Sequence, residues 1–288
     1  MYSYTLIDPR PVSREAELKR LASTPNVLGI EVTVPELADA CGLGNLDPQH
    51  TGGDSATAAI EEAVSCPLPP HGATLATVRA DLDSLGSMAV LTLRMQGVAI
   101  SGPVAERVAL IADHDKNPPA QTAEGEVTPL QALNLPVFNH RLPVADRVAL
   151  VAEYLTTGSF TGQEEAASQI RRDRAEQARV SDTVTLAAGG RIAVVESTSR
   201  FAVSAAYQHA GVVVAVNPAF RFAGGPPHRK VTVAQARLGL VDLKAVFADL
   251  SQIEPGWGGS PSVGGSPQGV GSQVPTAQVV AVLEKHLL

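Results

Sequence analysis

The sequence predicts an α/β protein with two domains, an N-terminal one built on a mostly parallel sheet and a smaller C-terminal α/β one. Short apolar, β-branched segments alternate with helical segments through residues 1–165, a pattern typical of parallel sheets. A strongly charged helical segment follows, and near residue 181 the composition changes to valine-rich segments joined by glycines. We therefore expect domains at 1–165 and 182–288, with a connecting helix at 166–181.

Each N-terminal element is predicted from its apolar spacing and its flanking residues. Pro35 takes the first helical position that proline favours, and Asp54 or Ser55 is the expected N-cap of the helix after the polar loop. The expected elements are a helix at 13–22, a strand at 28–34, a helix from Pro35, a polar loop at 45–54, a helix at 55–64, a strand at 73–78, a helix through 88–93, a helix at 104–112, a proline-rich loop at 117–139 and a helix at 143–155.

The C-terminal elements follow from the same patterns. A Gly-Gly pair at 189–190 joins two apolar segments, which is typical of a β-hairpin. The expected elements are a charged helix at 163–179, hairpin strands at 184–187 and 191–196, a helix at 200–209, strands at 212–216 and 230–233, a helix at 241–250, a glycine- and serine-rich segment at 256–272 and a last amphipathic helix ending at Leu288.

The composition narrows the classes of function. A net charge of −7 argues against binding long nucleic acid through a basic surface, but not against a nucleotide held by local arginines. No apolar segment approaches the ~20 residues of a membrane span, and the first eight residues lack signal-peptide features. With only two cysteines, Cys41 and Cys66, we expect buried thiols in a cytosolic protein. The expected partner is a small anionic molecule. The oligomeric state stays open, with a homodimer among the alternatives.

Two carboxylates mark the end of the predicted strand at 73–78. Asp81 and Asp83 stand two residues apart just before a helix, at the place where open α/β sheets bind ligands. In an extended segment they would point to the same side and repel each other, and a hard divalent cation relieves such repulsion. The alternative is helix capping, with Asp83 or Ser84 as N-cap and Asp81 as a solvated acid.

Histidine is scarce, with seven in the chain, so its placement is informative. His50 lies in the polar loop between Asp47 and Asp54. If this loop follows another strand of the same sheet, its side chains supply imidazole and oxygen ligands near Asp81 and Asp83.

A second acidic histidine motif lies at the end of the helix predicted at 104–112. His114 stands between Asp113 and Asp115, and His140 follows the proline-rich loop. We predict that His50, Asp81, Asp83, Asp113 and Asp115 bind Mn²⁺ or Mg²⁺, which would activate water to attack a phosphorus atom. His114 or His140 would assist proton transfer. Taken singly, each histidine is also compatible with a structural role.

The segment at 256–272 is either a flexible linker or a substrate-binding loop. It contains one Trp and two Gly-Gly-Ser-Pro repeats, which favours binding, because glycines let backbone N–H groups approach an anion. Arg79 is either an ion-pair partner of the acidic pair or a clamp for substrate. The expected substrate-binding residues are Arg79, Arg221, Gly258, Gly259, Ser260, Gly264, Gly265 and Ser266.

These motifs together resemble the DHH/DHHA1 phosphoesterase superfamily. The similarity rests on residues 81–87, on 113–115, on the C-terminal segments at 229–233 and 241–243, and on the glycine-rich segment, and it covers most of residues 73–288. The resemblance implies a metal-binding α/β domain, a smaller substrate-binding domain, and manganese-dependent phosphoester hydrolysis in the cleft between them.

The chain departs from the family pattern in the spacing from Asp83 to Asp113, which is shorter than the family's and contains no separate Asp motif, and at three further places. Arg79 stands where the family has a metal-ligand His, Asp115 replaces the final His of the signature, and the glycine-rich segment lacks a His. The acidic motifs and the resemblance predict a metal-dependent hydrolase of a small phosphorylated or nucleotide-like substrate, and the departures leave other functions open. The alternatives are a catalytically inactive anion-binding or regulatory protein with the same fold, and a metal-dependent hydrolase or lyase of a non-phosphate substrate.

Overall fold

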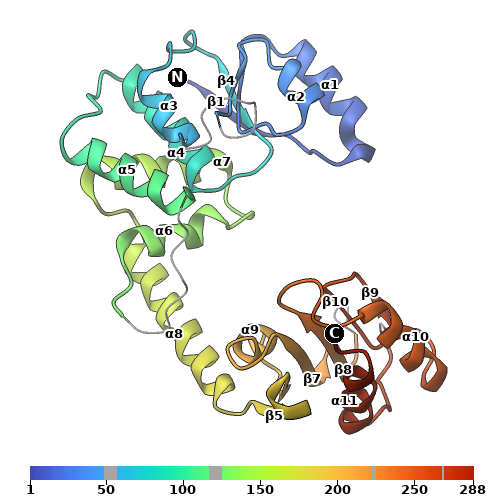
Figure 1. Ribbon diagram of the computed structural model, residues 1–288. Helices are drawn as coiled ribbons and strands as arrows, with labels where there is room; N and C mark the ends of the chain where they lie inside the picture. The colour runs from blue at the N-terminus through green and yellow to red at the C-terminus, as the bar shows by residue number, and fades with distance from the viewer. Residues whose placement is uncertain (49–56, 117–124, 222–224, 268) are drawn as a thin grey trace. The chain divides into compact units, whose positions relative to one another are not determined.

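A computed structural model describes residues 1–48, 57–116, 125–221, 225–267 and 269–288 (Figure 1). His50, Asp54 and Ser55 lie outside these residues. The chain forms two compact units, Met1–Arg171 and Arg172–Leu288. Helix α8 (Gln163–Ser181) crosses the division between them.

The first unit is built on a four-stranded sheet in the order β1-β4-β2-β3, with every neighbouring pair parallel. Its strands are β1 (Ser3–Leu6), β2 (Val27–Ile30), β3 (Asn45–Leu46) and β4 (Thr74–Thr77). All four residues of β2 are buried, as expected for a parallel strand covered on both faces.

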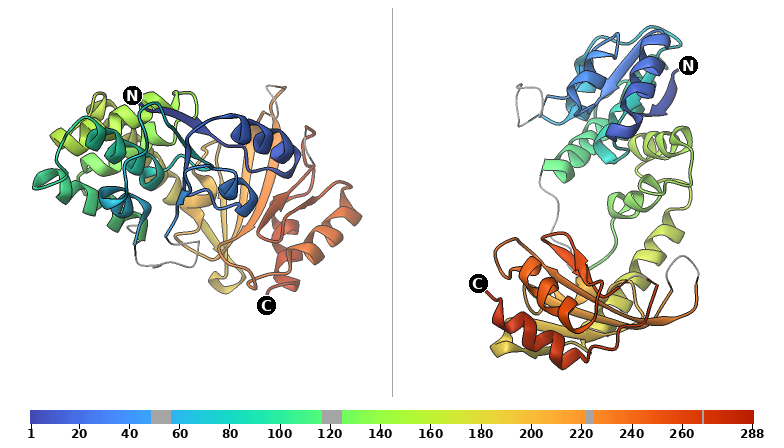
Figure 2. Two further views of the ribbon diagram at one scale, coloured as in Figure 1. Left: turned by 90° about the horizontal axis from the view of Figure 1, so that it is seen from above. Right: turned by 90° about the vertical axis from the view of Figure 1, so that its right-hand side faces the viewer.

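Helices cover both faces of this sheet (Figures 1 and 2). On one face, Val27 and Ala76 pack with residues of α1 and α2. On the other, Leu28, Ile30 and Leu75 pack with α3 to α7. The helices are α1 (Arg14–Ser23), α2 (Pro35–Asp39), α3 (Ala59–Ser65), α4 (Leu82–Met95), α5 (Pro103–Lys116), α6 (Pro129–Val137) and α7 (Val144–Thr157), with a 3-10 turn at Pro11–Ser13.

The second unit is built on a mixed six-stranded sheet in the order β5-β6-β7-β8-β10-β9, in which only β6 and β7 run parallel. Valines of β7 pack alternately with α10 and α11 on one face and with α9 on the other. The elements are β5 (Thr185–Ala187), a 3-10 turn at Ala188–Gly190, β6 (Ile192–Glu196), α9 (Ala202–Ala206), β7 (Val212–Phe220), β8 (His228–Gln235), α10 (Leu243–Ile253), β9 (Gly258–Gly259), β10 (Val263–Gly265) and α11 (Thr276–Lys285).

The α/β class, the two sheets and most helices are as the sequence predicts. The prediction of a loop at 117–139 is wrong for Pro129–Val137, which form α6. Thr128 and Gln131 form a capping box there, and Pro129 occupies the first turn. The strand predicted at 28–34 ends at Ile30, where Glu31 takes a left-handed φ of 49°.

Three further boundaries differ from the prediction. Helix α3 begins at Ala59 with Ala58 as N-cap, so Asp54 and Ser55 do not cap it. Helix α5 continues to Lys116 and takes in the acidic histidine motif expected after it. The segment at 256–272 contains the hairpin strands β9 and β10 and is therefore not a linker.

Among the described residues, no helix has the length and apolar character needed to span a membrane.

Candidate functional site

Three parallel strands bring acidic residues to one edge of the first sheet. Glu31 directly follows β2, Asp47 directly follows β3, and Asp81 lies four residues beyond the end of β4. The register continues past the strands, because the Glu31 N–H donates to the Leu46 carbonyl at 2.9 Å. Carboxyl ends of parallel strands are where open α/β sheets bind ligands. We call Glu31, Asp47, Asp81 and Asp83 the carboxyl edge.

The backbone at this edge is locally specialised. Glu31 has the left-handed φ noted above, which is uncommon for a residue with a side chain. After β4, the Thr77 hydroxyl donates to the Arg79 carbonyl at 3.0 Å and accepts from the Arg79 N–H at 3.2 Å. This turn directs the chain from the strand into α4, where Asp81 is the N-cap.

The Ser84 hydroxyl joins two of the acids. Its Oγ lies 2.6 Å from Glu31 Oε2 and 2.9 Å from Asp81 Oδ1, and the Ser84 N–H donates to Asp81 Oδ1 at 3.1 Å. Burial, followed by the charges of Asp81 and Asp83, raises the pKa of Glu31 to about 8. One hydroxyl hydrogen can serve only one carboxylate, so the proton retained by Glu31 supplies the second hydrogen bond at neutral pH.

Asp83 holds helix α3. It is only 1% exposed, and its Oδ2 and Oδ1 accept the N–H groups of Ala59 and Ile60 at 2.9 Å and 2.8 Å. Ala58, the N-cap of α3, has no side-chain acceptor, so Asp83 fills that role from α4. Burial, together with the charges of Asp115 and Asp81, nevertheless raises the pKa of Asp83 to about 7.

The capping alternative therefore applies to both aspartates, but with other assignments than the sequence predicts. Asp81, not Asp83 or Ser84, caps α4, and Asp83 lies inside the first turn of that helix rather than in an extended segment.

The donor chemistry at the carboxyl edge suits a hard divalent cation. However, no three His, Cys, Asp or Glu side chains of the described residues are placed to hold a metal ion. Both oxygens of Asp83 already accept N–H groups of α3. His50 follows Asp47 by three residues and lies outside the described residues. In type the donors fit a metal, but the described residues by themselves do not complete a site.

The acidic histidine motif lies in the last turn of α5. The Nε2 atom of His114 is 3.1 Å from Asn134 Nδ2, on α6. Lys116 Nζ pairs with Glu61 Oε2 of α3 at 3.0 Å. The charge of Asp115 contributes to the raised pKa values of both Glu31 and Asp83, which places this carboxylate near the carboxyl edge.

The other residues predicted in this unit lie at the surface. Asp113 is exposed in the same turn of α5, and His140 is exposed on the turn between α6 and α7. Arg79 Nε pairs with Asp81 Oδ2 at 3.2 Å, and the Arg79 side chain is 75% exposed. Solvent screens such a pair, so the guanidinium is accessible to an anion as well.

The glycine-rich segment is shaped by close backbone packing. A Cβ atom on Gly264 would overlap the Phe247 ring, and one on Gly265 would overlap the Val231 carbonyl. Ser266 is buried, where its Oγ accepts the Val231 N–H at 3.0 Å and its carbonyl accepts from the Lys230 ammonium. These three residues have clear structural roles, and their predicted contact with substrate stays a prediction.

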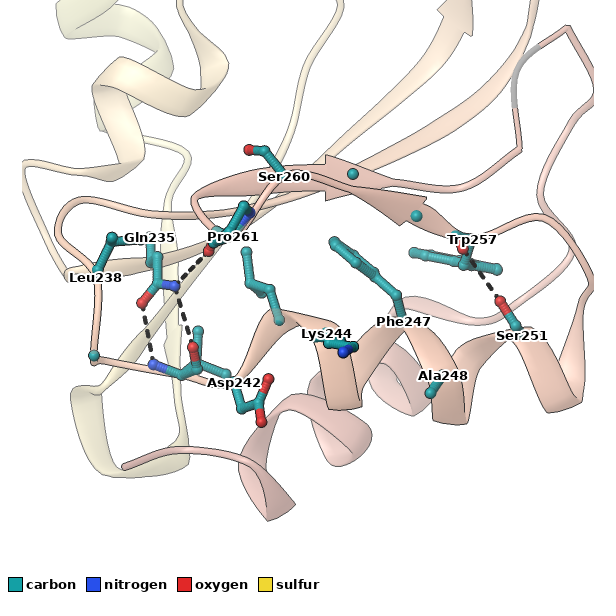
Figure 3. A pocket seen from close by; sticks show the side chains of 15 residues that line it. Gln235, Leu238, Asp242, Lys244, Phe247, Ala248, Ser251, Trp257, Ser260 and Pro261 are labelled. Atoms are coloured by element: carbon teal, nitrogen blue, oxygen red, sulfur yellow. Dashed lines mark hydrogen bonds between the residues drawn. The ribbon is translucent and has the colours of Figure 1, made fainter.

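A cavity of about 640 Å³ lies beside this segment, between α10 and the β9–β10 hairpin (Figure 3). Gly258, Gly259 and Ser260 line it. Arg221, also predicted to bind substrate, does not line this cavity; it is exposed, and its Nη1 donates to the Gly225 carbonyl at 3.2 Å. The other lining residues are Gln235, Leu238, Gly239, Val241, Asp242, Leu243, Lys244, Phe247, Ala248, Ser251, Trp257 and Pro261.

The chain is similar in structure to a pGpG-specific phosphodiesterase, PggH, from Vibrio cholerae. The two share 10% sequence identity with a TM-score of 0.40 over 83% of this chain and 92% of that chain. No protein-family model matches the sequence, and neither does any curated protein.

Sequence reasoning missed Glu31 and the residues of α10 that line the cavity. It grouped Asp47 with His50 but did not assign it as a ligand. A signal for Glu31 existed: it is the first charged residue after the apolar run of β2, just as Asp47 follows β3. Lys244 and Phe247 gave no signal of this kind, because their place beside the hairpin depends on tertiary packing.

Proposed function

We propose that this chain is a metal-dependent hydrolase of a small phosphorylated or nucleotide-like molecule, with its reactive centre at the carboxyl edge. The observation that carries the proposal is that Glu31, Asp47 and Asp81 follow three parallel strands of one sheet, with Glu31 and Asp81 joined through the Ser84 hydroxyl and Asp83 buried two residues after Asp81. A cation would offset the repulsion between these acids, and the raised pKa of Glu31, caused by burial and then by the charges of Asp81 and Asp83, supports the proposal.

The chain's own residues have separable tasks in this proposal. Asp81, Asp47 and His50 would hold a Mn²⁺ or Mg²⁺ ion, with Asp115 and Asp113 on the neighbouring turn of α5. Such an ion, when bound, supplies Lewis-acid activation of a water and of the phosphoryl group.

Four further side chains support or complete that centre. Ser84 aligns Glu31 with Asp81 through its hydroxyl, and Asp83 fixes α3 against α4. The exposed Arg79 guanidinium would bind the phosphate, and His114 of α5 would transfer the proton.

The test is Mn²⁺ binding by isothermal titration calorimetry, combined with hydrolysis of bis(p-nitrophenyl) phosphate. We expect saturable Mn²⁺ binding and Mn²⁺-dependent release of nitrophenol, both lost in Asp81→Asn and both retained in the exposed control Asp39→Asn. Absence of Mn²⁺ binding in the wild type would overturn the metal-dependent mechanism.

The second candidate is an anion-binding or regulatory protein without hydrolysis. A specific observation favours it: both Asp83 oxygens are taken up by α3, and the described residues hold no three-ligand group. This candidate predicts that a small anion stabilises the protein against heat without being turned over. The same nitrophenol assay separates the two candidates.

A further inference from the structure

The segment after β2 breaks the alternation of side chains that a strand imposes. Successive side chains of a strand point to opposite faces of its sheet. Val27 packs with α1 and α2, and Ile30 with α3 to α7, so Glu31 would be expected to face α1 and α2. Instead, Val32 is buried on that face, and Glu31 contacts the Ser84 hydroxyl in the first turn of α4. The alternation therefore shifts by one residue at position 31.

The backbone of Glu31 explains this shift. Its φ of 49° is left-handed, and one such residue in a strand re-aims the side chains around it, as in a β-bulge. A glycine would adopt this φ at little cost, whereas a side chain makes it unfavourable. Strain of this kind persists only where the surrounding structure enforces it, and it is found most often at functional sites.

The side chain of Asn45 supplies that enforcement. Asn45 begins β3, and its Oδ1 accepts the Val32 N–H at 3.1 Å while its Nδ2 donates to the Val32 carbonyl at 3.2 Å. One amide thus makes both of the hydrogen bonds that a further strand residue would make. On the other side, the Glu31 N–H donates to the Leu46 carbonyl at 2.9 Å. Residue 31 is therefore fixed from both sides.

Gly29 makes room for this amide. A Cβ atom at Gly29 would lie 2.6 Å from Asn45 Oδ1 and 3.1 Å from the Val32 side chain. The φ of Gly29 is not left-handed, so here the glycine is needed for space rather than for its conformation. Gly29 and Asn45 lie opposite each other in the register of β2 and β3, which places the glycine where the amide has to pass.

We propose that Asn45 is a positioning residue for the carboxyl edge. With Gly29 making room for it, its side-chain amide holds residue 31 in the left-handed conformation that directs the Glu31 carboxyl group to Ser84. Ser84 in turn contacts Asp81 Oδ1. The consequence for metal binding rests on the proposed function, but the hold on residue 31 does not.

The hold on residue 31 is tested in EDTA, without metal. Glu31→Gly and Glu31→Ala both remove the carboxyl group, but only glycine adopts a left-handed φ freely. We expect the melting temperature of Glu31→Gly to exceed that of Glu31→Ala by about 2–4 °C. When Asn45→Ala is added to both variants, residue 31 can relax and this difference should disappear. Gly29→Ala, which displaces the amide from the other side, should have the same effect.

The consequence for the site is tested by Mn²⁺ titration calorimetry of the full-length protein. Changes in residues that support metal ligands cost at least about tenfold in affinity, and we expect this loss in Asn45→Ala, Gly29→Ala and Glu31→Ala alike. In the Glu31→Ala background, adding Asn45→Ala should cause no further loss. The control is Thr74→Ala, which removes a hydrogen bond to Ser3 at the far end of β4 and should leave Mn²⁺ affinity unchanged. Circular dichroism checks the folding of each variant.

Two outcomes would overturn the proposal. The first is an advantage of Glu31→Gly over Glu31→Ala that is missing from the start or that survives both Asn45→Ala and Gly29→Ala. The second is an equal loss of Mn²⁺ affinity from Asn45→Ala with and without Glu31, which is the result of a purely structural role. Absence of Mn²⁺ binding in the wild type would instead remove the proposed function and the role at a metal site, while the comparison in EDTA still decides whether Asn45 holds residue 31.

Discussion

Asp83 has a structural role that does not depend on any chemistry at the carboxyl edge. Its carboxylate is the side-chain cap that helix α3 lacks at Ala58, and it lies next to the charges of Asp81 and Asp115. A carboxylate that caps a helix in this way is stabilising, whether or not a metal binds nearby. Its presence alone is therefore weak evidence for catalysis.

The first prediction concerns that cap. Asp83→Ala leaves the buried N–H groups of Ala59 and Ile60 without an acceptor, so we expect a loss of about 2 kcal/mol in the free energy of unfolding. Asp39→Ala, at the exposed end of α2, should change it by about 0.5 kcal/mol or less. Urea denaturation monitored by circular dichroism measures both. Equal effects of the two variants would show that Asp83 does not cap α3.

The second prediction concerns pH. Folding raises the pKa of Glu31 from an ordinary value near 4.5 to about 8, and that of Asp83 from 3.8 to about 7. Between these values the native state binds more protons than the unfolded state, so the stability that these two groups contribute is fullest below about pH 4 and is lost as the pH rises through 7 and 8. Thermal unfolding in EDTA should therefore show a lower Tm at pH 8 than at pH 5.

A variant assigns this slope to the carboxyl edge. Glu31→Gln cannot ionise, so its Tm should fall less between pH 5 and pH 8 than that of the wild type. If the two profiles run parallel, the titration of Glu31 does not set the pH dependence.

Sequence reasoning at the residue scale succeeded where the signal was local. Asp81 and Asp83 stand together in one short motif, and the pattern indicated either capping or binding. Glu31 is 50 residues away from Asp81 along the chain, and they meet only because β2 and β4 are parallel neighbours. A single sequence does not reveal which strands are neighbours, so the contact through Ser84 could not be predicted.

At the scale of elements, the β9–β10 hairpin contains glycines at which close packing leaves no room for a side chain, and one at which a side chain would fit. A Cβ on Gly265 would overlap the Val231 carbonyl of β8, whereas a Cβ on Gly258 would meet nothing within 4 Å. Both glycines lie in strands of the same hairpin, which makes them a matched pair.

The third prediction follows from this pair. Gly265→Ala should destabilise the second unit by about 2 kcal/mol or more, because the Val231 carbonyl is backbone and has little room to move. Gly258→Ala should be close to neutral. Hydrogen–deuterium exchange of β8 and the hairpin provides the readout, and comparable exchange in the two variants would contradict the close approach of β8 and β10.

The elements that sequence reasoning missed are short or interrupted. β3 has two residues and β1 has four, too few for apolar alternation to be distinguished from a loop. Helix α6 was hidden by prolines, although Pro129 stands at a position that helices accept and the capping box around Thr128 marks its start. Long amphipathic helices such as α7 and α10 carried enough periodicity to be predicted.

At the scale of the whole molecule, each unit has its own hydrophobic core. Leu91 of α4 belongs to the core of the first unit and Leu250 of α10 to that of the second, and both are fully buried. The α/β class was predictable, because both cores are built from Val, Leu, Ile and Ala at strand and helix spacing. The pairing order within each sheet was not.

The fourth prediction is that the two cores unfold separately. Leu91→Ala and Leu250→Ala each remove buried methyl groups, at a cost of about 2–5 kcal/mol. Differential scanning calorimetry should show two transitions, with each variant lowering a different one. A single transition lowered equally by both variants would show that the units unfold as one.

The strand order of the first sheet determines when β1 can pair during synthesis at the ribosome. β1 is synthesised first, yet its neighbour in the sheet of the described residues is β4, which begins at Thr74. β2 and β3 can already pair while β1 has nothing to pair with. Strand β1 must therefore remain unpaired until β4 emerges, and in this interval nascent-chain factors and proteases can still reach it.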